Sequence, residues 1–441
     1  TLGTCYTDGL TGACTDNFVR NELGEFEAYA TAQKPGYASD MDEDPSYPYI
    51  VIPERYDIDE LKVESIRNGI PPIYESGLDE LLRSVDMQVT TDYEKTMTSK
   101  IIILCLNTPS DERGINLDPI SGAARELAGI LKKRRDYCVI AVKSTVVPGT
   151  TEGLVIPALE KSGKKLGKDF GVCMSPEFLR EGKAIDDFME PARVIVGEYD
   201  RASGDTFCQL YKHSNAPIMR TNIKTAEMIK LASNAFLATK ISYINEIGNM
   251  CKQLGIDAYD VAKGMGFDDR IGSKFLNAGL GFGGSCLPKD LRMLIAKAKE
   301  VNYQPGILEE VLRLNDGQAA RVIDLLKRHV QLKGAVIGLL GLAFKSGTDD
   351  VRDSRAIGIV EALLQEGARV RAYDPLAADN FRKLFPQIEY TTKEEVLNSA
   401  AIVIATEWEE FNNLDYRGKI VIDGRRMAKA REARIYEGIC W

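Results

Sequence analysis

Short apolar runs alternate with helix-like stretches through the first half of the chain. Four of the runs have the length and composition of buried strands, at residues 100–106, 138–143, 171–174 and 193–197. Between them, apolar residues recur at helical spacing, for example over 119–133 and 150–161. This alternation is typical of a parallel sheet covered by helices. We therefore expect functional residues at the carboxyl ends of the strands, where such folds bind their ligands.

From residue 225 to about residue 254 the apolar pattern changes to the helical period. Apolar side chains recur every three or four residues and no proline interrupts the run. The pattern predicts one long helix of roughly 30 residues. Lys230 and Asn234 lie one turn apart on one face of it. A solvent-exposed position and a role in a site both fit these two side chains.

The last third repeats the first pattern. Its predicted strands are 334–340, 368–374, 401–406 and 419–422, with a helix over 354–367. The chain therefore reads as an α/β protein with two Rossmann-like, doubly wound domains, joined by the long central helix and a helical middle domain. The predicted domains are residues 1–218, 219–318 and 319–441.

A glycine-rich loop over residues 279–290 contains the most distinctive chemistry of the chain. Four glycines fall within six positions, Cys286 follows them, and Lys289 and Asp290 come shortly after. A cysteine beside a lysine or at a helix N-terminus can become a thiolate at neutral pH. The loop is therefore either a covalent-catalysis site with a cysteine nucleophile or a flexible connector with a buried, inert cysteine.

Composition limits the classes of function. The chain has 441 residues, 44% of them hydrophobic and 27% charged, which is typical of a globular protein with two or three domains. No apolar run has the length of a membrane span, and Thr1 opens no signal-like segment, so we expect no membrane partner. The net charge of −9 argues against nucleic acid as a partner.

Cysteine and histidine usage narrows the chemistry further. Nine scattered cysteines form no CxxC pair, which predicts a reducing cytoplasmic location and no metal site. The two histidines, His213 and His329, lie in charged, helix-like settings and suit surface or packing positions. Without more histidines, a Ser-His-Asp triad or a histidine-rich metal site is not expected. The chemistry must use Cys, Lys, Asp, Glu, Asn and Thr.

The N-terminal stretch departs from the dinucleotide-binding pattern. The run from Gly3 to Asp8 contains only the first glycine of a GxGxxG turn, and almost no strand precedes it. Residues 17–55 are polar, acidic and contain prolines, as expected for a loop or a poorly ordered insertion. After them, Asp57 either ends a strand as a ribose-binding carboxylate or lies in a solvated acidic turn.

Six motifs together resemble the UDP-glucose/GDP-mannose dehydrogenase family, from about residue 57 to the C-terminus. They lie at residues 73–78, 143–150, 175–182, 230–234, 279–290 and 344–352. The resemblance implies that the chain oxidises the C6 alcohol of a nucleotide sugar to a carboxylate, a four-electron reaction with NAD as the cofactor. Residues 232–246 look more like the UDP-glucose branch, so UDP-glucose is the implied substrate, with GDP-mannose or another nucleotide sugar as the alternative.

The resemblance also assigns roles to individual residues. Cys286 would add to the aldehyde to give a thiohemiacetal and then a thioester, Lys230 and Asn234 would stabilise the oxyanion, and Asp290 would position water. Glu181 and Thr145 would be acid/base and water-holding residues, and Glu177 a further carboxylate of the same loop. The implied NAD-binding residues are Gly3, Asp57, Lys62, Thr108, Ser144, Thr145, Glu181 and Arg352.

A third set of positions matches residues that hold the nucleotide sugar. They are Phe178, Leu179, Lys230, Asn234, Arg270, Phe275, Gly283, Lys289, Phe344, Lys345 and Arg425. Arg270 would reach the sugar of a neighbouring subunit, which implies a homodimer built on the long helix. Lys289 would contact a substrate phosphate or tune Cys286.

One departure from the family pattern leaves the function open. Cys5 and Asp8 stand where the second and third glycines of the family's opening belong. Three explanations compete: an altered N-terminal sequence, an insertion that rearranges the site but keeps its function, or a loss of NAD binding. The last would leave a sugar-nucleotide-binding protein without activity.

Overall fold

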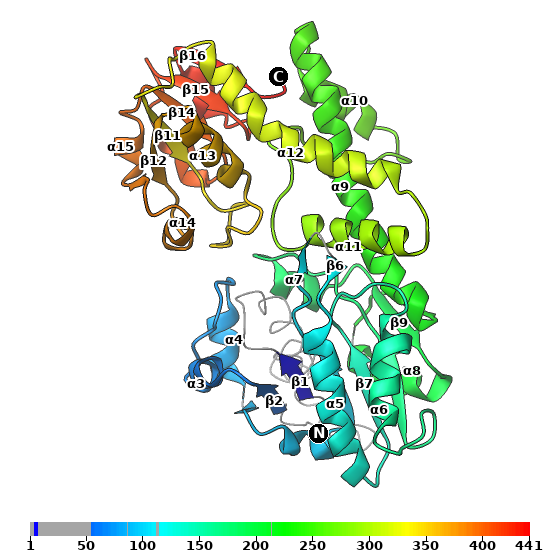
Figure 1. Cartoon of the computed structure of the whole chain (residues 1–441). Coiled ribbons are helices and arrows are strands. Elements are labelled where there is room, and N and C mark those ends of the chain that lie inside the picture. Colours follow the sequence, from blue (N-terminus) through cyan, green and yellow to red (C-terminus); the bar gives the residue numbers. More distant parts are fainter. Residues whose placement is uncertain (1–3, 8–53, 86, 112–113, 213) are drawn as a thin grey trace. The chain divides into compact units, whose positions relative to one another are not determined.

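The structure is a computed structural model, and it describes residues 4–7, 54–85, 87–111, 114–212 and 214–441. The chain forms two compact units, Thr1–Ala232 and Ser233–Trp441 (Figure 1). Gly3, Asp8, His213 and most of the stretch 17–55 lie outside the described residues. Within the described residues, no helix combines the length and the apolar character that a membrane crossing requires.

The first unit is built on an eight-stranded sheet in the order β10-β9-β8-β7-β4-β1-β2-β3. Its strands are β1 Thr4–Thr7, β2 Glu54–Asp57, β3 Gln88–Thr90, β4 Ile101–Leu104, β7 Cys138–Val142, β8 Phe170–Met174, β9 Val194–Glu198 and β10 Ile218–Thr221. From β3 to β8 the neighbours are parallel and follow the order 3-2-1-4-5-6 of a dinucleotide-binding fold.

Helices cover both faces of this sheet. The helices are α3 Glu60–Arg67, α4 Leu78–Ser84, α5 Asp118–Lys133, α6 Ile156–Glu160, α7 Ala184–Met189 and α8 Arg201–Cys208. The unit also contains the short helical turns η2 Tyr93–Thr98, η3 Thr151–Val155 and η4 Gln209–Tyr211. A small hairpin is formed by β5 Ser110–Asp111 and β6 Gly114–Ile115. Ile102 and Leu104 pack in the core with α5, whereas Ile101 packs in the core with α3 and α4. Burial on both faces explains why the strands are continuous apolar runs.

Three sequence predictions for this unit are corrected. The strand predicted at 193–197 is β9, but it runs antiparallel to β8, so the sheet is not wholly parallel. The first strand was expected to be almost absent, but Thr4–Thr7 form β1, which pairs with β2 and β4. Glu54 and Arg55 belong to β2 and not to the predicted insertion.

The second unit contains a six-stranded, fully parallel sheet in the order β13-β12-β11-β14-β15-β16. The strands are β11 Val336–Leu340, β12 Arg369–Tyr373, β13 Glu389–Tyr390, β14 Ala401–Ile404, β15 Ile420–Asp423 and β16 Ile435–Gly438. The order is again 3-2-1-4-5-6, so the point where the strand order reverses lies between β11 and β14. Two Rossmann-like sheets are therefore present, as predicted.

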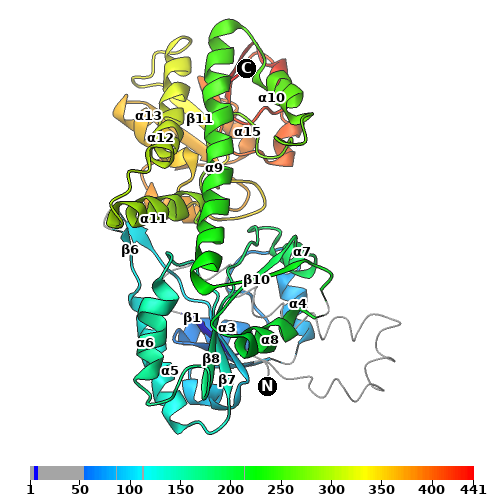
Figure 2. The same ribbon diagram turned by 90° about the vertical axis from the view of Figure 1, so that its right-hand side faces the viewer.

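The long helix α9, Ile223–Leu254, has 32 residues and begins two residues before the predicted start (Figure 2). The other helical elements of the second unit are α10 Ala258–Gly266, α11 Leu287–Glu300, α12 Gly306–Lys327, α13 Arg355–Gln365, α14 Ala378–Leu384, α15 Lys393–Val396, η5 Glu409–Asn413 and η6 Lys429–Glu432. Helices α9 and α12 are joined by a buried hydrogen bond in which Ser242 Oγ donates to Val311 O at 3.0 Å.

Candidate active site

The carboxyl ends of the strands in the first unit carry the predicted NAD-binding residues. Asp57 ends β2 and is buried, and its carboxylate accepts the Asp59 N–H at 3.0 Å. Thr108, after β4, donates its hydroxyl to Thr145 O at 2.7 Å. Ser144 Oγ, after β7, accepts the Leu106 N–H at 2.6 Å. These contacts join the loops that follow β4 and β7.

The turn after β7 is also held from α9. The buried carboxylate of Glu227 accepts the N–H groups of Gly149 and Thr151 at 2.6 and 2.9 Å. Burial is the main cause that raises the pKa of this carboxyl. Glu227 thereby anchors the residues that follow Ser144 and Thr145.

This edge of the sheet fits NAD. The acidic residue at the end of the second strand is the group that binds a ribose diol in dinucleotide folds, and Asp57 occupies that place. The ammonium of Lys62 is buried, lies 4.0 Å from Asp59 Oδ2, and has no hydrogen-bond partner within the described residues. A positive group whose hydrogen-bond donors are unused suits an anionic ligand. Gly3 lies outside the described residues, and Arg352 belongs to the second unit.

A buried ion pair organises the loop that follows β8. Glu177 Oε1 accepts from Lys230 Nζ at 2.7 Å, and Glu177 Oε2 accepts the Leu179 N–H at 2.7 Å. The guanidinium of Arg193 lies 3.9 Å from the centre of the Phe178 ring, and Lys230 Nζ lies 5.4 Å from it. Lys230 is therefore a buried cation in this site and not a solvent-exposed residue.

The next turn of the same loop is held by Glu75, from the motif at residues 73–78. Its buried carboxylate accepts the N–H groups of Gly182 and Ala184 at 2.8 and 2.9 Å. Gly182 has a φ of +74°, in the left-handed region that glycine tolerates. Glu75 thus fixes the turn that carries Glu181.

The second unit contains the glycine-rich loop, and the structure explains its glycines. Gly281 and Gly284 have φ values of +94° and +84°. A Cβ at Gly283 would lie 2.3 Å from Asp353 O, and one at Gly284 would lie 2.6 Å from the Phe344 ring. The Gly284 N–H also donates to Arg352 O at 2.9 Å. The loop therefore packs tightly against the segment that follows Phe344.

Cys286 lies directly before the first residue of α11. The Asp290 N–H donates to Cys286 O at 2.8 Å, and the sulfur lies 3.5 Å from Ser285 Oγ. The N-terminus of a helix stabilises negative charge, which favours a thiolate at this position. The sulfur is partly exposed. The structure thus places the thiol where a nucleophile could act.

One turn later, the buried Asp290 contacts two predicted site residues. Its Oδ2 accepts from Asn234 Nδ2 at 2.7 Å, and its Oδ1 lies 3.0 Å from Lys289 Nζ. Asn234 is itself buried. Lys289 is therefore paired with the adjacent carboxylate.

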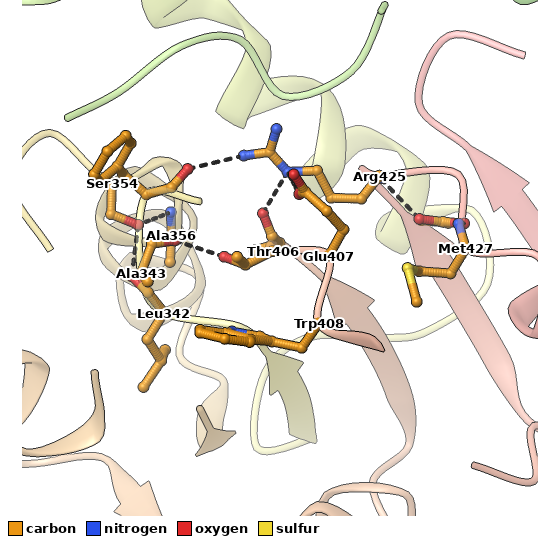
Figure 3. Close-up of polar contacts among 12 residues, drawn as sticks. Leu342, Ala343, Ser354, Ala356, Thr406, Glu407, Trp408, Arg425 and Met427 are labelled. Atoms are coloured by element: carbon orange, nitrogen blue, oxygen red, sulfur yellow. Dashed lines mark hydrogen bonds and ion pairs between the residues drawn. The ribbon is translucent and has the colours of Figure 1, made fainter. Parts of the chain in front are cut away.

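Loops from three strands of the second unit meet near Arg425 (Figure 3). Arg425, after β15, donates from Nε to Ala405 O at 2.7 Å and from Nη2 to Phe344 O at 3.4 Å, and it pairs with Glu407 at 3.2 Å. Lys345 Nζ lies 5.4 Å from the Phe344 ring centre. This is the switch point between β11 and β14, where open α/β sheets bind ligands.

The acid that follows β12 is already used within the protein. Asp374 is buried, and its carboxylate oxygens accept N–H groups from Leu342, Ala343, Trp408, Leu376 and Ala377 at 2.7–3.1 Å. It anchors the loops around this switch point instead of facing a ribose, as the equivalent acid of a dinucleotide site does. The two sheets therefore offer different ligand sites.

Two predicted residues lie at the surface of the second unit. Arg270 is exposed and pairs with Asp268 at 2.6 Å. Phe275 is partly exposed and has a φ of +65°, an uncommon conformation for a residue other than glycine. Arg352 forms a two-point ion pair with Asp350.

The predicted residues thus form one set in each unit. The first contains Asp57, Lys62, Thr108, Ser144, Thr145, Glu177, Phe178, Leu179, Glu181 and Lys230, and the second contains Asn234, Arg270, Phe275, Gly283, Cys286, Lys289, Asp290, Phe344, Lys345, Arg352 and Arg425. Sequence reasoning missed Glu75, Arg193 and Glu227. Glu75 lies in the motif at residues 73–78, and this position was the one available signal.

Comparisons with known proteins agree with this architecture. Models of the UDP-glucose/GDP-mannose dehydrogenase family match residues 54–215 (NAD binding domain), 224–317 (central domain) and 338–430 (UDP binding domain). UDP-glucose 6-dehydrogenase AglM of Haloferax volcanii is 43% identical over 400 residues, covering 87% of this chain and 93% of that protein. GDP-mannose 6-dehydrogenase of Pseudomonas savastanoi pv. phaseolicola is 36% identical over 412 residues, covering 87% of this chain and 93% of that protein.

A solved structure matches over almost the whole length. The UDP-glucose dehydrogenase of the hyperthermophilic archaeon Pyrobaculum islandicum is 36% identical, with a TM-score of 0.89 over 100% of this chain and 98% of that one. The resemblance inferred from the motifs is therefore confirmed by sequence and by structure. The chain belongs to the UDP-glucose/GDP-mannose dehydrogenase family.

Proposed function

We propose that this chain oxidises the C6 alcohol of UDP-glucose to the carboxylate of UDP-glucuronate with two molecules of NAD. One observation carries the assignment: Cys286 stands at the N-terminus of α11, one turn before the buried Asp290–Asn234 pair. The second oxidation needs a nucleophile such as a thiol, because an aldehyde can lose a hydride only after a nucleophile has added to its carbonyl carbon. The similarity to UDP-glucose 6-dehydrogenases supports the choice of sugar.

The proposed steps balance in atoms and electrons. The alcohol first loses a hydride and a proton to become the aldehyde. The Cys286 sulfur then bonds to the aldehyde carbon, and the oxygen gains a proton to give a thiohemiacetal. Loss of a second hydride and a proton leaves a thioester. Water adds to its carbonyl carbon, the C–S bond breaks, and the carboxylate and the free thiol result. When bound, NAD would supply the hydride acceptor for each oxidation.

We assign roles to the surrounding groups by their chemistry. The Lys230 ammonium and the Asn234 amide are donors suited to a developing oxyanion. The carboxylates of Asp290 and Glu181, with the Thr145 hydroxyl, suit the positioning and deprotonation of water. Glu177 holds the Lys230 ammonium through a buried ion pair.

Two ligand sites support the proposal. NAD would bind through Asp57, Lys62, Thr108, Ser144, Thr145, Glu181 and Arg352, with Gly3 as a further predicted residue. The sugar nucleotide would bind through Phe178, Leu179, Lys230, Asn234, Arg270, Phe275, Gly283, Lys289, Phe344, Lys345 and Arg425. The loops around Arg425 supply cationic and aromatic groups for a nucleotide, since a guanidinium matches phosphate geometry and a ring stacks on a base.

We also propose a homodimer built on α9. Phe236, Tyr243, Met250 and Leu254 follow one stripe of the helix, and between 49% and 72% of each is exposed. An exposed apolar stripe at heptad spacing is typical of a helix that packs against a partner. The exposed Arg270 would then reach the substrate of the neighbouring subunit. The domain boundaries 1–218, 219–318 and 319–441, and the cytoplasmic location, stay predictions.

Two alternatives have specific support. GDP-mannose as the sugar is favoured by the 36% identity to a GDP-mannose 6-dehydrogenase. Binding without catalysis is favoured by the N-terminal sequence, because Cys5 and Asp8 stand where the second and third glycines of the family's opening belong. In that case the chain would hold a UDP sugar without binding NAD.

Counting NADH per sugar consumed separates these possibilities. The protein is incubated with NAD and UDP-glucose, or with GDP-mannose, and NADH absorbance is compared with the loss of sugar nucleotide. We expect two NADH per UDP-glucose and little turnover of GDP-mannose. No NADH with either sugar, together with UDP-glucose binding in calorimetry, would contradict the proposed reaction and support the binding role.

A further inference from the structure

Buried carboxamide side chains from α9 and α12 form hydrogen bonds with the glycine-rich loop at Gly279 and at Phe282. Asn245, Asn315 and Gln318 are each no more than 1% exposed. Asn245 Oδ1 accepts the Gly279 N–H at 2.7 Å, and Gln318 Nε2 donates to Gly279 O at 2.8 Å. Both backbone groups of Gly279 are therefore bound by side chains of two different helices.

Asn315 binds both backbone groups of Phe282 in the same way. Its Oδ1 accepts the Phe282 N–H at 2.8 Å, and its Nδ2 donates to Phe282 O at 3.1 Å. A Cβ at Gly281, which has a φ of +94°, would lie only 2.2 Å from Asn315 Oδ1. Gly281 is thus needed both for its backbone conformation and for the approach of Asn315.

The two helices are linked behind the loop by the same kind of group. Asn249 Nδ2, on α9, donates to Gln318 Oε1, on α12, at 2.9 Å. Gln318 therefore contacts α9 and the loop at once. A fully bonded carboxamide orients its neighbours because each lost bond would leave a buried polar group unpaired, at a cost of about 1–3 kcal/mol.

We propose that Asn245, Asn315 and Gln318 are positioning residues that set the place and reactivity of Cys286. Cys286 follows Phe282 by four residues and precedes α11 directly, so a loop clamped at Gly279 and Phe282 leaves its sulfur little freedom at the helix N-terminus. Neutral amides supply a donor and an acceptor without a charge that would alter the thiol. This inference rests on the proposed nucleophilic role of Cys286.

The test compares Asn315→Ala with Ser242→Ala in the full chain. Ser242 also joins α9 to α12 through a buried hydrogen bond, but its hydroxyl donates to Val311 O and not to the loop. Iodoacetamide labelling of Cys286, followed by mass spectrometry of its peptide, is measured from pH 6 to pH 10 without NAD or sugar. Thermal unfolding midpoints and, separately, kcat and KM for UDP-glucose and NAD are measured on the same variants.

We expect Asn315→Ala to change the labelling rate or its pH midpoint at Cys286 and to lower kcat about tenfold, with the KM for NAD nearly unchanged. Ser242→Ala should lose thermal stability but keep the wild-type labelling profile. Identical labelling profiles in both variants would overturn the proposal, because the amides would then serve stability alone. The labelling arm is independent of turnover, so it stands even where no NADH forms with any sugar.

A second comparison guards against a variant that folds poorly. Gly281→Ala and Asn315→Ala are measured alone and together by the labelling assay. The Cβ of Gly281→Ala would displace the Asn315 side chain, which Asn315→Ala removes. The labelling rate of the double variant should therefore differ from that of the wild type by no more than the rate of the worse single variant does. If the fold-changes in labelling rate of the two single variants multiply in the double variant, the two residues act independently. That result would contradict the proposal that Asn315 holds the loop.

Discussion

At the scale of single residues, the site depends on charges that are buried and paired. Lys230 and Glu177 are 4% and 2% exposed at their side chains, and their charged atoms lie 2.7 Å apart. Removing one partner of such a pair typically costs about 3–5 kcal/mol, because the other charge stays buried. The same pair holds the loop through the Leu179 N–H.

Glu177→Gln should therefore lower the free energy of unfolding by about 3 kcal/mol and lower kcat. The neutral amide cannot balance the Lys230 ammonium. Urea unfolding of the variant beside the wild type measures the first effect, and NADH formation measures the second. The double variant Lys230→Met/Glu177→Leu should regain part of the stability but none of the activity; a single variant as stable as the wild type would contradict the argument.

Asp423 predicts a pH dependence of stability. Burial raises the pKa of this carboxyl to about 6, partly offset by hydrogen bonds from Arg425, Met427 and Tyr436. Because the pKa is raised on folding, the neutral carboxyl stabilises the fold below about pH 4, and this contribution is lost as the pH rises through about 6. A carboxyl with an ordinary pKa would make no such contribution.

Relative to Asp423→Asn, the wild type should lose about 3 kcal/mol of stability between pH 4 and pH 7. The amide does not titrate, so the difference between the two proteins isolates this group. Denaturant unfolding at pH 4, 5, 6 and 7 provides the measurement. A difference that is constant over that range would show that the carboxyl titrates normally.

Cys286 is the residue on which the chemistry depends most directly. Cys286→Ala should abolish formation of the sugar acid, because no thiohemiacetal can form, while binding of UDP-glucose is retained. Product analysis by chromatography and calorimetric titration give the two readouts. Unchanged acid formation in this variant would contradict the covalent mechanism.

At the scale of elements, the glycine-rich loop works because it lacks side chains where other segments approach it. Gly284 needs its left-handed conformation, and the Phe344 ring occupies the space that a Cβ would take. The loop, α11 and the segment after Phe344 therefore form one packed assembly. Conformational freedom at the glycines and close packing around them are both required.

Gly284→Ala should lower kcat/KM for UDP-glucose about tenfold, with NAD binding less affected, because Arg352 is the one residue of the second unit among those predicted to bind NAD. Steady-state kinetics and NAD titration check this. The control is Gly264→Ala, on α10, where an added Cβ has no atom within 4 Å. That variant should be active and slightly more stable, since alanine favours a helix over glycine.

At the scale of the whole molecule, the apolar stripe of α9 is a surface that the described part of a single chain leaves exposed. The double variant Phe236→Lys/Tyr243→Lys would place two charges in the proposed dimer interface. We expect it to be monomeric by light scattering after gel filtration, while the wild type is dimeric. Leu384→Lys, at another half-exposed apolar site, should leave the dimer intact; a monomeric wild type would contradict the assembly.

Local pattern in the sequence predicted most strands and the long helix correctly, whereas the roles of the site residues stay predictions. Buried parallel strands are continuous apolar runs, so β4, β7, β8, β11, β12, β14 and β15 were all located. The helical period located α9, and the end of a strand was one of two interpretations of Asp57, the one that the structure confirms. These features depend on neighbours along the chain, which is why sequence alone determined them.

Tertiary structure decided what depends on distant partners. The antiparallel direction of β9 and the central place of β1 follow from pairing between strands, which a local pattern does not encode. Glu75 binds Gly182 across 107 residues, and Asn315 binds Phe282 across 33. The residues next to a glutamate or an asparagine in the sequence do not indicate that its side chain makes such a distant hydrogen bond. The sequence by itself determined the chemistry that is present, and the fold decided which backbone groups hold it in place.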